Sequence, residues 1–471
     1  MKPVVLFGAG TGGRIVKWML EDFGVPVRAF ADNSRAKQGT MQDGLPIISP
    51  DSLYDDECGI VIASTWETEI RKQLNDMGMG SRVIGKEVFM YQYLEQSADK
   101  YSDLAGYPID SAKKPTFLFG TDLGLYQGGV ESWTYTVADE LRKRGYEIKI
   151  LTNKSSQPAP ERFAKDTYYL NMRGRGYCNG LEDTVHVIME HAPCVVIDSW
   201  QSMTMLAASI VKRQNQAAVC SLIEIVHNDL PRLFEIVKRF ENEIDACMGV
   251  SRDINRNLVE NYHIRPEKVH YKESPVNYDA DLRREYAGDS RKPLRIGYAA
   301  RLAKSQKRAD LLPELMDRLS ERKVHFQMQI AGSGALQDMI ETHISEKGYA
   351  GVVSMTGYIR REEMNRFWSG QDIFINLSEY EGVGLSMLEA MGNGCVPVVT
   401  KVAGSEEFVT KDIGYVCEVG DLNAMAERIA YLDWHREMLE PMGQKACESA
   451  RKKCSVEAYV DHLLGMVPVI R

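Results

Sequence analysis

The sequence predicts an α/β protein made of parallel-sheet domains, and three observations support this. Short apolar segments rich in Val, Ile and Phe alternate with helical patterns along the chain, and glycine-rich turns follow several of these segments. Such alternation is typical of parallel sheets covered by helices. The chain has 471 residues, 44% of them hydrophobic and 26% charged, which suits two or three ordinary globular domains.

Composition and charge argue against several classes of protein. The formal net charge of -9 argues against bulk nucleic-acid binding. The nine cysteines are scattered and form no Cys-x-x-Cys pair, as expected of reduced thiols in the cytoplasm. No apolar run approaches the roughly 20 residues of a membrane span, and the first residues enter a strand directly, so we expect no signal peptide. We therefore expect a cytoplasmic protein, with any membrane contact peripheral and at the inner face.

The first domain is expected over residues 1–95 and begins with a dinucleotide-binding pattern. Val4–Phe7 is predicted as a strand, the turn Gly8-Ala-Gly10-Thr-Gly-Gly13 leads into a helix, and a second strand, Val27–Ala31, ends at Asp32. In such a Rossmann arrangement the glycines let a pyrophosphate approach and the acid binds the ribose. Gly8, Gly10, Gly13 and Asp32 therefore form a candidate nucleotide site. The alternative stays open: a docking domain that keeps its glycines for packing and could mediate homo-oligomer formation.

The same block resembles the small Rossmann-like domains that precede sugar-modifying enzymes in bacterial surface-polysaccharide pathways. The resemblance covers the glycine turn, Phe30-Ala-Asp-Asn33 and Leu45–Pro50. Residues 96–114 follow as a polar linker that ends in Lys113-Lys before Pro115. Because the linker is polar, we expect a chain that starts near Ser111 to fold without the first domain.

Two further Rossmann-type domains are expected, over residues 115–290 and 291–455. The turn Gln127-Gly-Gly-Val-Glu131 leads into a helix that carries Trp133. A C-terminal helix over residues 456–471 is expected to pack back on the first of these two domains. The predicted strands are Thr116–Phe119, Tyr146–Leu151, Cys194–Ile197, Ala217–Leu222, Met248–Ser251, Leu294–Tyr298, Phe326–Ile330, Val352–Met355, Ile373–Leu377 and Val396–Val399.

The segment from Glu381 to Glu389 is the most informative part of the chain. It follows a predicted buried strand, and Gly382 and Gly384 open a tight turn before a helix begins near Leu385. The first N–H groups of a helix have no partner within it and attract anions. One carboxylate precedes this turn and the other lies on the helix behind it. The arrangement favours a ligand with an anionic middle and hydroxyls at both ends, such as a nucleotide sugar.

From about residue 115 onward the chain resembles the glycosyltransferases of family 4, which have the GT-B architecture of two facing Rossmann-like domains. The resemblance implies an acceptor domain over residues 115–290 and a nucleotide-sugar donor domain over residues 291–455, preceded by the small Rossmann-like domain. Ala403 and Glu406 depart from the last of the family's motifs. The matching motifs, in the family's order, are Gln127–Glu131, Arg301 with Lys307, Ala331–Gly334, Gly357–Ile359, Glu381 with Glu389, and Val402–Glu407.

The resemblance also implies a role for each candidate residue. Arg301 and Lys307 would offset the charge that develops on the leaving diphosphate. Glu381 would hold hydroxyls of the transferred sugar, Glu389 would accept hydrogen bonds from the ribose diol, and His227 would face the sugar. The remaining candidates would line the donor: Gly382, Val383, Gly384 and Leu385 near sugar and phosphate, Gly129 facing the diphosphate, and Tyr358 and Ile359 flanking the base.

These expectations describe a retaining glycosyltransferase that needs neither metal nor cofactor and uses a nucleotide-diphosphate sugar. No Asp-x-Asp element that could hold a metal follows a predicted strand of the third domain. The acceptor could be a glycan, a lipid-linked sugar or a protein in bacterial surface-glycan assembly, and no nucleic-acid partner is expected. Two alternatives remain: an NAD-dependent nucleotide-sugar oxidoreductase or epimerase that uses the first glycine turn, and a non-catalytic nucleotide-sugar-binding protein.

Overall fold

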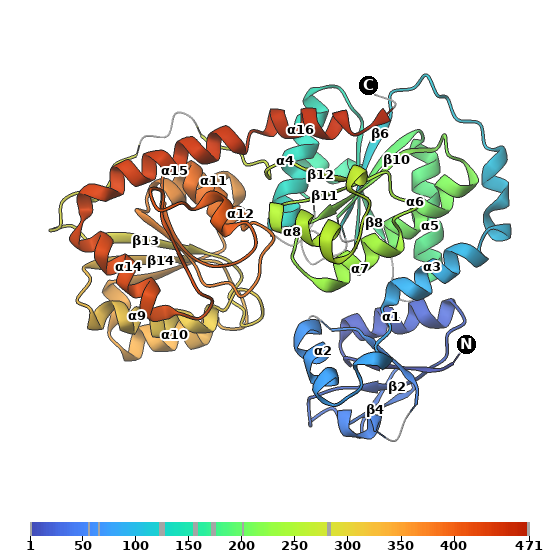
Figure 1. The fold of residues 1–471 in the computed structure, drawn as a ribbon, viewed down its shortest axis with the longest axis horizontal. Helices are drawn as coiled ribbons and strands as arrows, with labels where there is room; N and C mark the ends of the chain where they lie inside the picture. Colours follow the sequence, from blue (N-terminus) through green and yellow to red (C-terminus); the bar gives the residue numbers. More distant parts are fainter. Residues whose placement is uncertain are drawn as a thin grey trace.

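Three α/β domains make up the structure, each around its own sheet (Figure 1). The computed structural model describes residues 2–54, 57–64, 66–121, 128–153, 159–170, 176–199, 202–279 and 284–468. We refer to the N-terminal, middle and C-terminal domains. The α/β class predicted from the alternating pattern is confirmed.

The N-terminal domain has a five-stranded sheet in the order β3-β4-β2-β1-β5. The short pair β3 and β4 is antiparallel, and the other pairs are parallel. The strands predicted over residues 4–7 and 27–31 occur with those bounds. The elements are β1 (Val4–Phe7), α1 (Thr11–Asp22), β2 (Val27–Ala31), β3 (Met41–Gln42), β4 (Leu45–Ile48), β5 (Gly59–Ile62), α2 (Glu67–Asp76) and α3 (Lys86–Gln96).

The middle domain has a seven-stranded parallel sheet in the order β12-β11-β10-β9-β6-β7-β8. Its elements are β6 (Thr116–Thr121), α4 (Gly129–Lys143), β7 (Ile148–Asn153), β8 (Thr167–Leu170), α5 (Tyr177–His191), β9 (Cys194–Ser199), α6 (Ser202–Gln214), β10 (Val219–Val226), α7 (Pro231–Arg239), β11 (Ala246–Gly249), α8 (Arg252–Arg256) and β12 (Val269–Tyr271).

Strand β10 continues beyond the predicted end at Leu222. It runs to Val226 and includes Glu224, which lies opposite Asp198 of β9 in the sheet. Both carboxyl groups are buried, and burial raises the pKa of Glu224 to about 8. The predicted strand ended two residues before Glu224, whereas the structure keeps this residue in the sheet beside the carboxyl group of Asp198.

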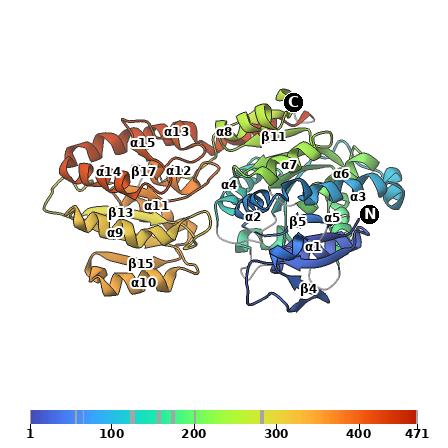
Figure 2. The same cartoon turned by 60° about the horizontal axis from the view of Figure 1, so that its bottom comes forward.

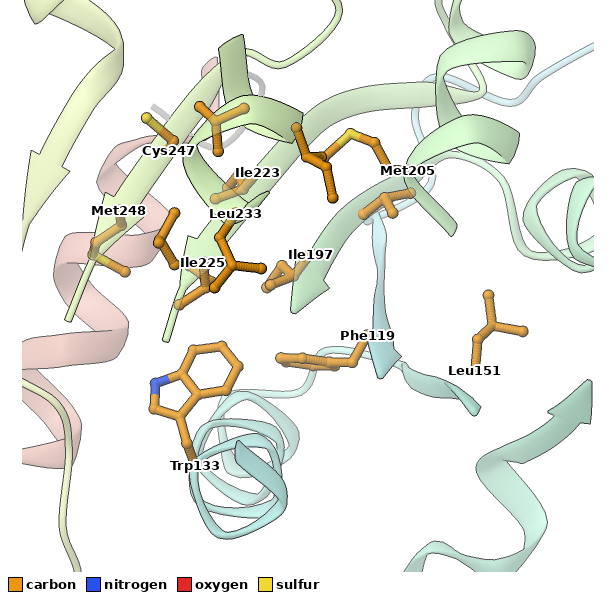
Figure 3. Packing of buried hydrophobic residues seen from close by; sticks show 14 of the residues in the cluster. Phe119, Trp133, Leu151, Ile197, Met205, Ile223, Ile225, Leu233, Cys247 and Met248 are labelled. Atoms are coloured by element: carbon orange, nitrogen blue, oxygen red, sulfur yellow. The ribbon is translucent and has the colours of Figure 1, made fainter. Parts of the chain in front are cut away.

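The core of the middle domain lies between α4 and the central strands. Figure 3 shows Trp133 projecting from α4 toward side chains that include Phe119 of β6 and Ile225 of β10. The Trp133 and Phe119 rings meet edge to face with centroids 6.0 Å apart. This packing fixes the helix whose first turn faces the C-terminal domain.

The C-terminal domain has a six-stranded parallel sheet in the order β15-β14-β13-β16-β17-β18. Its elements are β13 (Leu294–Ala299), α9 (Leu312–Glu321), β14 (Phe326–Ala331), α10 (Gln337–Glu346), β15 (Val353–Gly357), α11 (Arg361–Ser369), β16 (Ile373–Asn376), α12 (Leu385–Gly392), β17 (Val396–Thr400), α13 (Ser405–Phe408), β18 (Tyr415–Cys417), α14 (Leu422–Trp434) and α15 (Leu439–Lys453).

The chain crosses between the middle and C-terminal domains at two places that lie side by side. It leaves the middle domain after β12 and returns where α15 ends and α16 (Val456–Gly465) begins. The N–H of Val276 on the first crossing donates to the carbonyl of Cys454 on the second, at 3.1 Å. Helix α16 packs on α4 (Figure 1). There Tyr459 meets Trp133 edge to face.

The N-terminal domain packs closely on the middle domain. Helices α1 and α3 contact α5, α6 and α7, and one continuous hydrophobic core joins the two domains (Figure 2). The expected linker takes part in this packing: Asp99–Gly106 forms a 3-10 helix against α6, with Tyr101 buried. The polar composition of residues 96–114 obscured the few apolar residues that anchor this segment. A chain that starts near Ser111 would lack the N-terminal domain and therefore lose the shared core.

Candidate active site

Two loops at the carboxyl edge of the C-terminal sheet hold most of the candidate residues. Strands are added on one side of β13 and then, from β16 onward, on its other side. Ligands of open parallel sheets bind at such a switch point. The loop after β13 carries Arg301 and Lys307, and the loop after β16 carries Glu381. The sheet topology therefore brings together segments that are far apart in the sequence.

Backbone contacts hold these two loops against each other. Gln306 has a φ of 66°, in the left-handed region that side chains other than glycine rarely adopt. Its carbonyl accepts a hydrogen bond from the N–H of Glu379 at 2.8 Å. A strained residue is thus kept in place by a bond to the neighbouring loop.

Glu381 is the best-connected candidate residue. It is only 5% exposed, and its Oε1 accepts a hydrogen bond from the hydroxyl of Ser378 at 2.7 Å. The ammonium of Lys307 forms an ion pair with the same oxygen. The amide of Gln306 reaches Oε2 at 3.4 Å and also donates to Asn228 of the middle domain at 3.3 Å. The carboxylate is therefore fixed, charge-compensated and tied to the opposite domain.

The glycines after Glu381 let the two domains meet. A Cβ added to Gly382 would lie 2.0 Å from the carbonyl oxygen of His227, which no real atom could tolerate. Gly384 has a φ of 70° and precedes the first turn of α12. Val383 between them is buried, and Leu385 lies 3.4 Å from the position of a Cβ on Gly129 of α4. Glycine at 382 is thus required by a close approach between domains.

His227 follows β10 and faces this loop from the middle domain. It is buried, its Nε2 lies 3.3 Å from the hydroxyl of Ser199, and its ring meets Trp133 edge to face at 5.0 Å. Burial lowers the pKa of His227 to about 3. The imidazole is therefore neutral at physiological pH and can exchange hydrogen bonds without carrying charge.

A cavity of about 260 Å³, the cleft cavity, separates α4 from α11 and α12. Glu389 and Leu385 line it from the C-terminal domain, and Trp133 and Thr136 line it from α4. Burial raises the pKa of Glu389 to about 7, while the nearby charge of Arg361 acts in the opposite direction. Arg361 also donates a hydrogen bond to Thr136 across the cleft. Sequence reasoning missed Arg361, although it closely follows Tyr358 and Ile359.

Glu131 is a second residue that sequence reasoning did not single out as a site residue. It lies buried in the first turn of α4, where burial raises its pKa to about 7 and the charge of Arg301 across the cleft acts against this shift. Arg301 itself is exposed and donates to the side chain of Gln306 at 3.1 Å. Gln127, which begins the same motif, lies outside the described residues.

Tyr358 and Ile359 lie apart from this cluster. They follow β15, an edge strand that is two strands away from β13. Tyr358 is 46% exposed and Ile359 is half-buried. Gly357 before them has a φ of 66° and turns the chain at the end of the strand.

In the N-terminal glycine turn, internal contacts account for two glycines and for Asp32. A Cβ on Gly13 would lie 2.0 Å from the carbonyl oxygen of Gly8, which itself has a φ of 121°, whereas Gly10 has no atom within 4 Å. Asp32 accepts a hydrogen bond from the N–H of Ala9 at 2.9 Å and pairs with Lys37 at 3.1 Å. Packing within the domain therefore accounts for Gly8, Gly13 and the orientation of Asp32.

A metal-binding cluster and a membrane-spanning helix are both absent from the described residues. There, His, Cys, Asp and Glu side chains form no group of three or more that could hold a metal ion. None of the helices described is both long and apolar enough to span a bilayer.

Comparison with protein families gives a match for each domain. Residues 127–279 match the family described as Glycosyltransferase Family 4, and residues 281–449 match Glycosyl transferases group 1. Together these two matches cover more than half of the chain. Residues 1–84 match the description C2185-like, N-terminal.

Individual relatives are distant. Over 170 residues the chain is 28% identical to the sulfoquinovosyl transferase SQD2 of Arabidopsis thaliana, covering 35% of this chain and 31% of that protein. Over 173 residues it is 28% identical to the poly(ribitol-phosphate) alpha-N-acetylglucosaminyltransferase of Staphylococcus aureus, covering 36% and 34%. The chain thus spans about a third of the length of these curated relatives.

A solved structure shows the same fold. The Anabaena protein HepE in complex with UDP and glucose superposes with a TM-score of 0.62 at 15% sequence identity. The superposition covers 75% of this chain and 99% of that one. At this identity the likeness establishes the architecture of two facing Rossmann-like domains.

Proposed function

This chain belongs to the group 1/family 4 glycosyltransferases of GT-B fold, with a C2185-like domain at its N-terminus, and we propose that it transfers a sugar from a nucleotide-sugar donor to an acceptor hydroxyl. The transfer retains the anomeric configuration and needs no metal. The observation that carries the proposal is the buried Glu381–Lys307 pair at the switch point, facing the neutral His227.

In the proposed complex, the nucleotide of the donor lies in the cleft cavity and the sugar of the donor lies next to Glu381. Glu389 accepts hydrogen bonds from the ribose diol, and the amides at the start of α12 bind the diphosphate. Glu381 holds hydroxyls of the transferred sugar, and His227 exchanges a hydrogen bond with that sugar as a neutral group. Arg361, which lines the cleft cavity beside Glu389, is placed to contact the nucleotide.

Bond breaking develops negative charge on the diphosphate oxygen that leaves. Arg301 and Lys307 offset this charge, which is the kind of preorganised stabilisation that contributes most to such reactions. The acceptor oxygen forms a bond to the anomeric carbon on the face that the diphosphate leaves, and its proton passes to the leaving phosphate oxygen. Attack on this face retains the anomeric configuration. The side-chain charges of Arg301 and Lys307 replace a divalent ion.

The donor we favour is a UDP-sugar, supported by the UDP and glucose bound to the structurally similar HepE. The acceptor we favour belongs to bacterial surface-glycan assembly, supported by the poly(ribitol-phosphate) named for the staphylococcal relative. The family matches over residues 127–279 and 281–449 count against an NAD-dependent oxidoreductase, because that reading leaves these two domains unexplained.

The test is a panel of nucleotide sugars incubated in EDTA with the purified protein and a panel of glycan and polyol-phosphate acceptors, among them poly(ribitol-phosphate). We expect one donor to release its nucleoside diphosphate. In the proton NMR spectrum of the product, the anomeric coupling constant should match that of the donor sugar. The Glu381→Gln variant should release diphosphate at least about tenfold more slowly, since it loses a charge-assisted contact. An inverted product, NAD reduction, or binding without turnover of any donor would each refute the proposal.

A further inference from the structure

A second cavity, the junction cavity, lies where all three domains meet. Its volume is about 220 Å³. Its walls come from α2 of the N-terminal domain, from Leu230–Arg232 at the start of α7 in the middle domain, and from Tyr380 of the C-terminal domain. In Figure 1, α2 stands on the side of the N-terminal domain that is turned toward the C-terminal domain. The cavity therefore depends on the docked N-terminal domain.

Two walls of this cavity continue directly from the candidate active site. Tyr380 precedes Glu381 in the chain, and Leu230 closely follows His227. Gln306, whose amide reaches Glu381, also lies 3.4 Å from the carbonyl oxygen of Tyr380. A group bound in the junction cavity would therefore lie next to the proposed sugar position.

The cleft cavity is lined in part by residues that follow Glu381 in the chain. Leu385 and Glu389, which follow Glu381 along the chain, line the cleft cavity, whereas Tyr380, which precedes it, lines the junction cavity. A transferase needs two binding regions that meet at the transferred sugar. Because the cleft cavity suits the donor, the junction cavity is the complementary position for the acceptor.

The charged residues of the junction cavity favour an anion. Arg71, Lys72 and Arg232 line it, and Glu67 is the one carboxylate among its described lining residues. Glu67 pairs with Arg71 at 2.9 Å and with Arg232 at 3.6 Å, and so compensates only part of this charge. Glu235 lies behind the cavity, 3.3 Å from Arg71.

Individual side chains of the junction cavity also favour an anionic ligand. The Nε–H of Arg71 is buried and has no acceptor among the described residues. Lys72 is exposed at the wall. Burial raises the pKa of Tyr380, while the charges of Arg232 and Arg301 act in the opposite direction and that of the exposed Glu69 adds to it. Arg232 and Arg301 thus place positive charge near Tyr380, and the opposing charges around the cavity are Glu67, Glu69 and Glu235.

We propose that the junction cavity binds the acceptor through an anionic group, a phosphate or a carboxylate close to the accepting hydroxyl, and that α2 of the N-terminal domain thereby forms part of the acceptor site. The proposal rests on the glycosyltransferase function proposed above. Arg71 and Lys72 supply charge-assisted hydrogen bonds to the anion. The N-terminal domain then selects the acceptor without touching the nucleotide.

The experiment measures binding of small probes to the full chain saturated with UDP, so that the cleft is occupied. Methyl α-glucoside 6-phosphate and methyl α-glucuronide are compared with neutral methyl α-glucoside by titration calorimetry. A parallel arm uses vesicles of phosphatidylglycerol against vesicles of phosphatidylcholine, to distinguish a soluble anion from a lipid headgroup. Each probe is measured on the wild type and on Lys72→Glu, Glu69→Gln and Arg35→Ala.

We expect one anionic probe class to bind about tenfold more tightly than its neutral counterpart. Lys72→Glu should weaken that binding about fivefold to tenfold, and Glu69→Gln should strengthen it about twofold, because the first adds and the second removes negative charge. Arg35→Ala is the matched control, since Arg35 is an exposed cation of the same domain that does not line the cavity.

Two failures would be distinguishable. If UDP and nucleotide sugars do not bind the wild type, the proposed function itself fails. If UDP binds but no anionic probe is preferred, or if Lys72→Glu behaves like Arg35→Ala with an unchanged melting curve, the acceptor assignment is overturned while the donor site stands.

Discussion

Replacing Lys307 by methionine should lower kcat/KM for sugar transfer about a hundredfold. The Lys307 and Glu381 side chains are 20% and 7% exposed, so the variant leaves a nearly buried carboxylate without its cation. Breaking a buried pair costs roughly 3–5 kcal/mol. The Ser378 hydroxyl still donates to Glu381 and Lys307 is partly solvated, which favours the lower end of that range. That cost is one of folding stability, which the melt reports. The rate falls because Lys307 no longer offsets the charge that develops on the leaving group, a charge-assisted contact that contributes up to about 3 kcal/mol, or about two orders of magnitude in rate.

The assay is diphosphate release under kcat/KM conditions, with a thermal melt on the same preparation. Lys304→Met is the matched control, because Lys304 is exposed in the same loop and its loss should change the rate less than about threefold. In the double variant Lys307→Met with Glu381→Gln, the melting temperature should recover while the rate stays low. A Lys307→Met enzyme with wild-type kcat/KM would refute the reasoning, because the ion pair would then be purely structural.

Three further outcomes follow from the same geometry. Gly382→Ala should lower transfer more than about a hundredfold, because its Cβ would meet the carbonyl of His227 at 2.0 Å, whereas Gly351→Ala, with nothing within 4 Å, should not; equal rates would contradict the close approach. The pKa of Glu389 is raised from 4.5 to about 7, so its contribution to folding stability falls as pH rises from about 4.5 to 7. The ionised carboxylate that would accept hydrogen bonds from ribose predominates above about pH 7. UDP affinity should therefore rise between about pH 6 and 8 more steeply in the wild type than in Glu389→Gln, and parallel titration curves would speak against this role. A chain that begins at residue 111 should aggregate in size-exclusion chromatography, because the shared core opens; a monodisperse product that binds UDP would show that the N-terminal domain is dispensable.

Local pattern predicted the sheets and the residues on the C-terminal loops. The alternation of apolar strands and glycine turns specified β13, β14 and β16, and parallel-sheet topology then required their carboxyl ends to lie together, with Arg301, Lys307 and Glu381. The assignment of roles to these residues stays a prediction.

Contacts between domains were not predictable in this way. Arg361 faces Thr136, and Arg301 faces Glu131, only because two separately folded sheets meet across a cleft. No periodicity along the chain encodes such pairings. The docking of residues 96–114 was missed for a related reason: Tyr101, Leu104 and Ile109 are isolated apolar residues in a polar segment.

We infer that a line through the hydrogen bond between Val276 and Cys454 is the axis about which the middle and C-terminal domains can separate. Both covalent connections between the middle and C-terminal domains pass there, so a rigid rotation leaves that line fixed and displaces other points in proportion to their distance from it. The cleft cavity includes Val276 in its wall, whereas α2, which lines the junction cavity, lies on the side of the molecule away from α16 (Figure 1). Opening would thus admit and release acceptors while the nucleotide is still held, which is an ordered reaction. Spin labels at Glu69 and Glu379 should accordingly separate more on UDP release than labels at Asp139 and Glu362, and equal separations would contradict this axis.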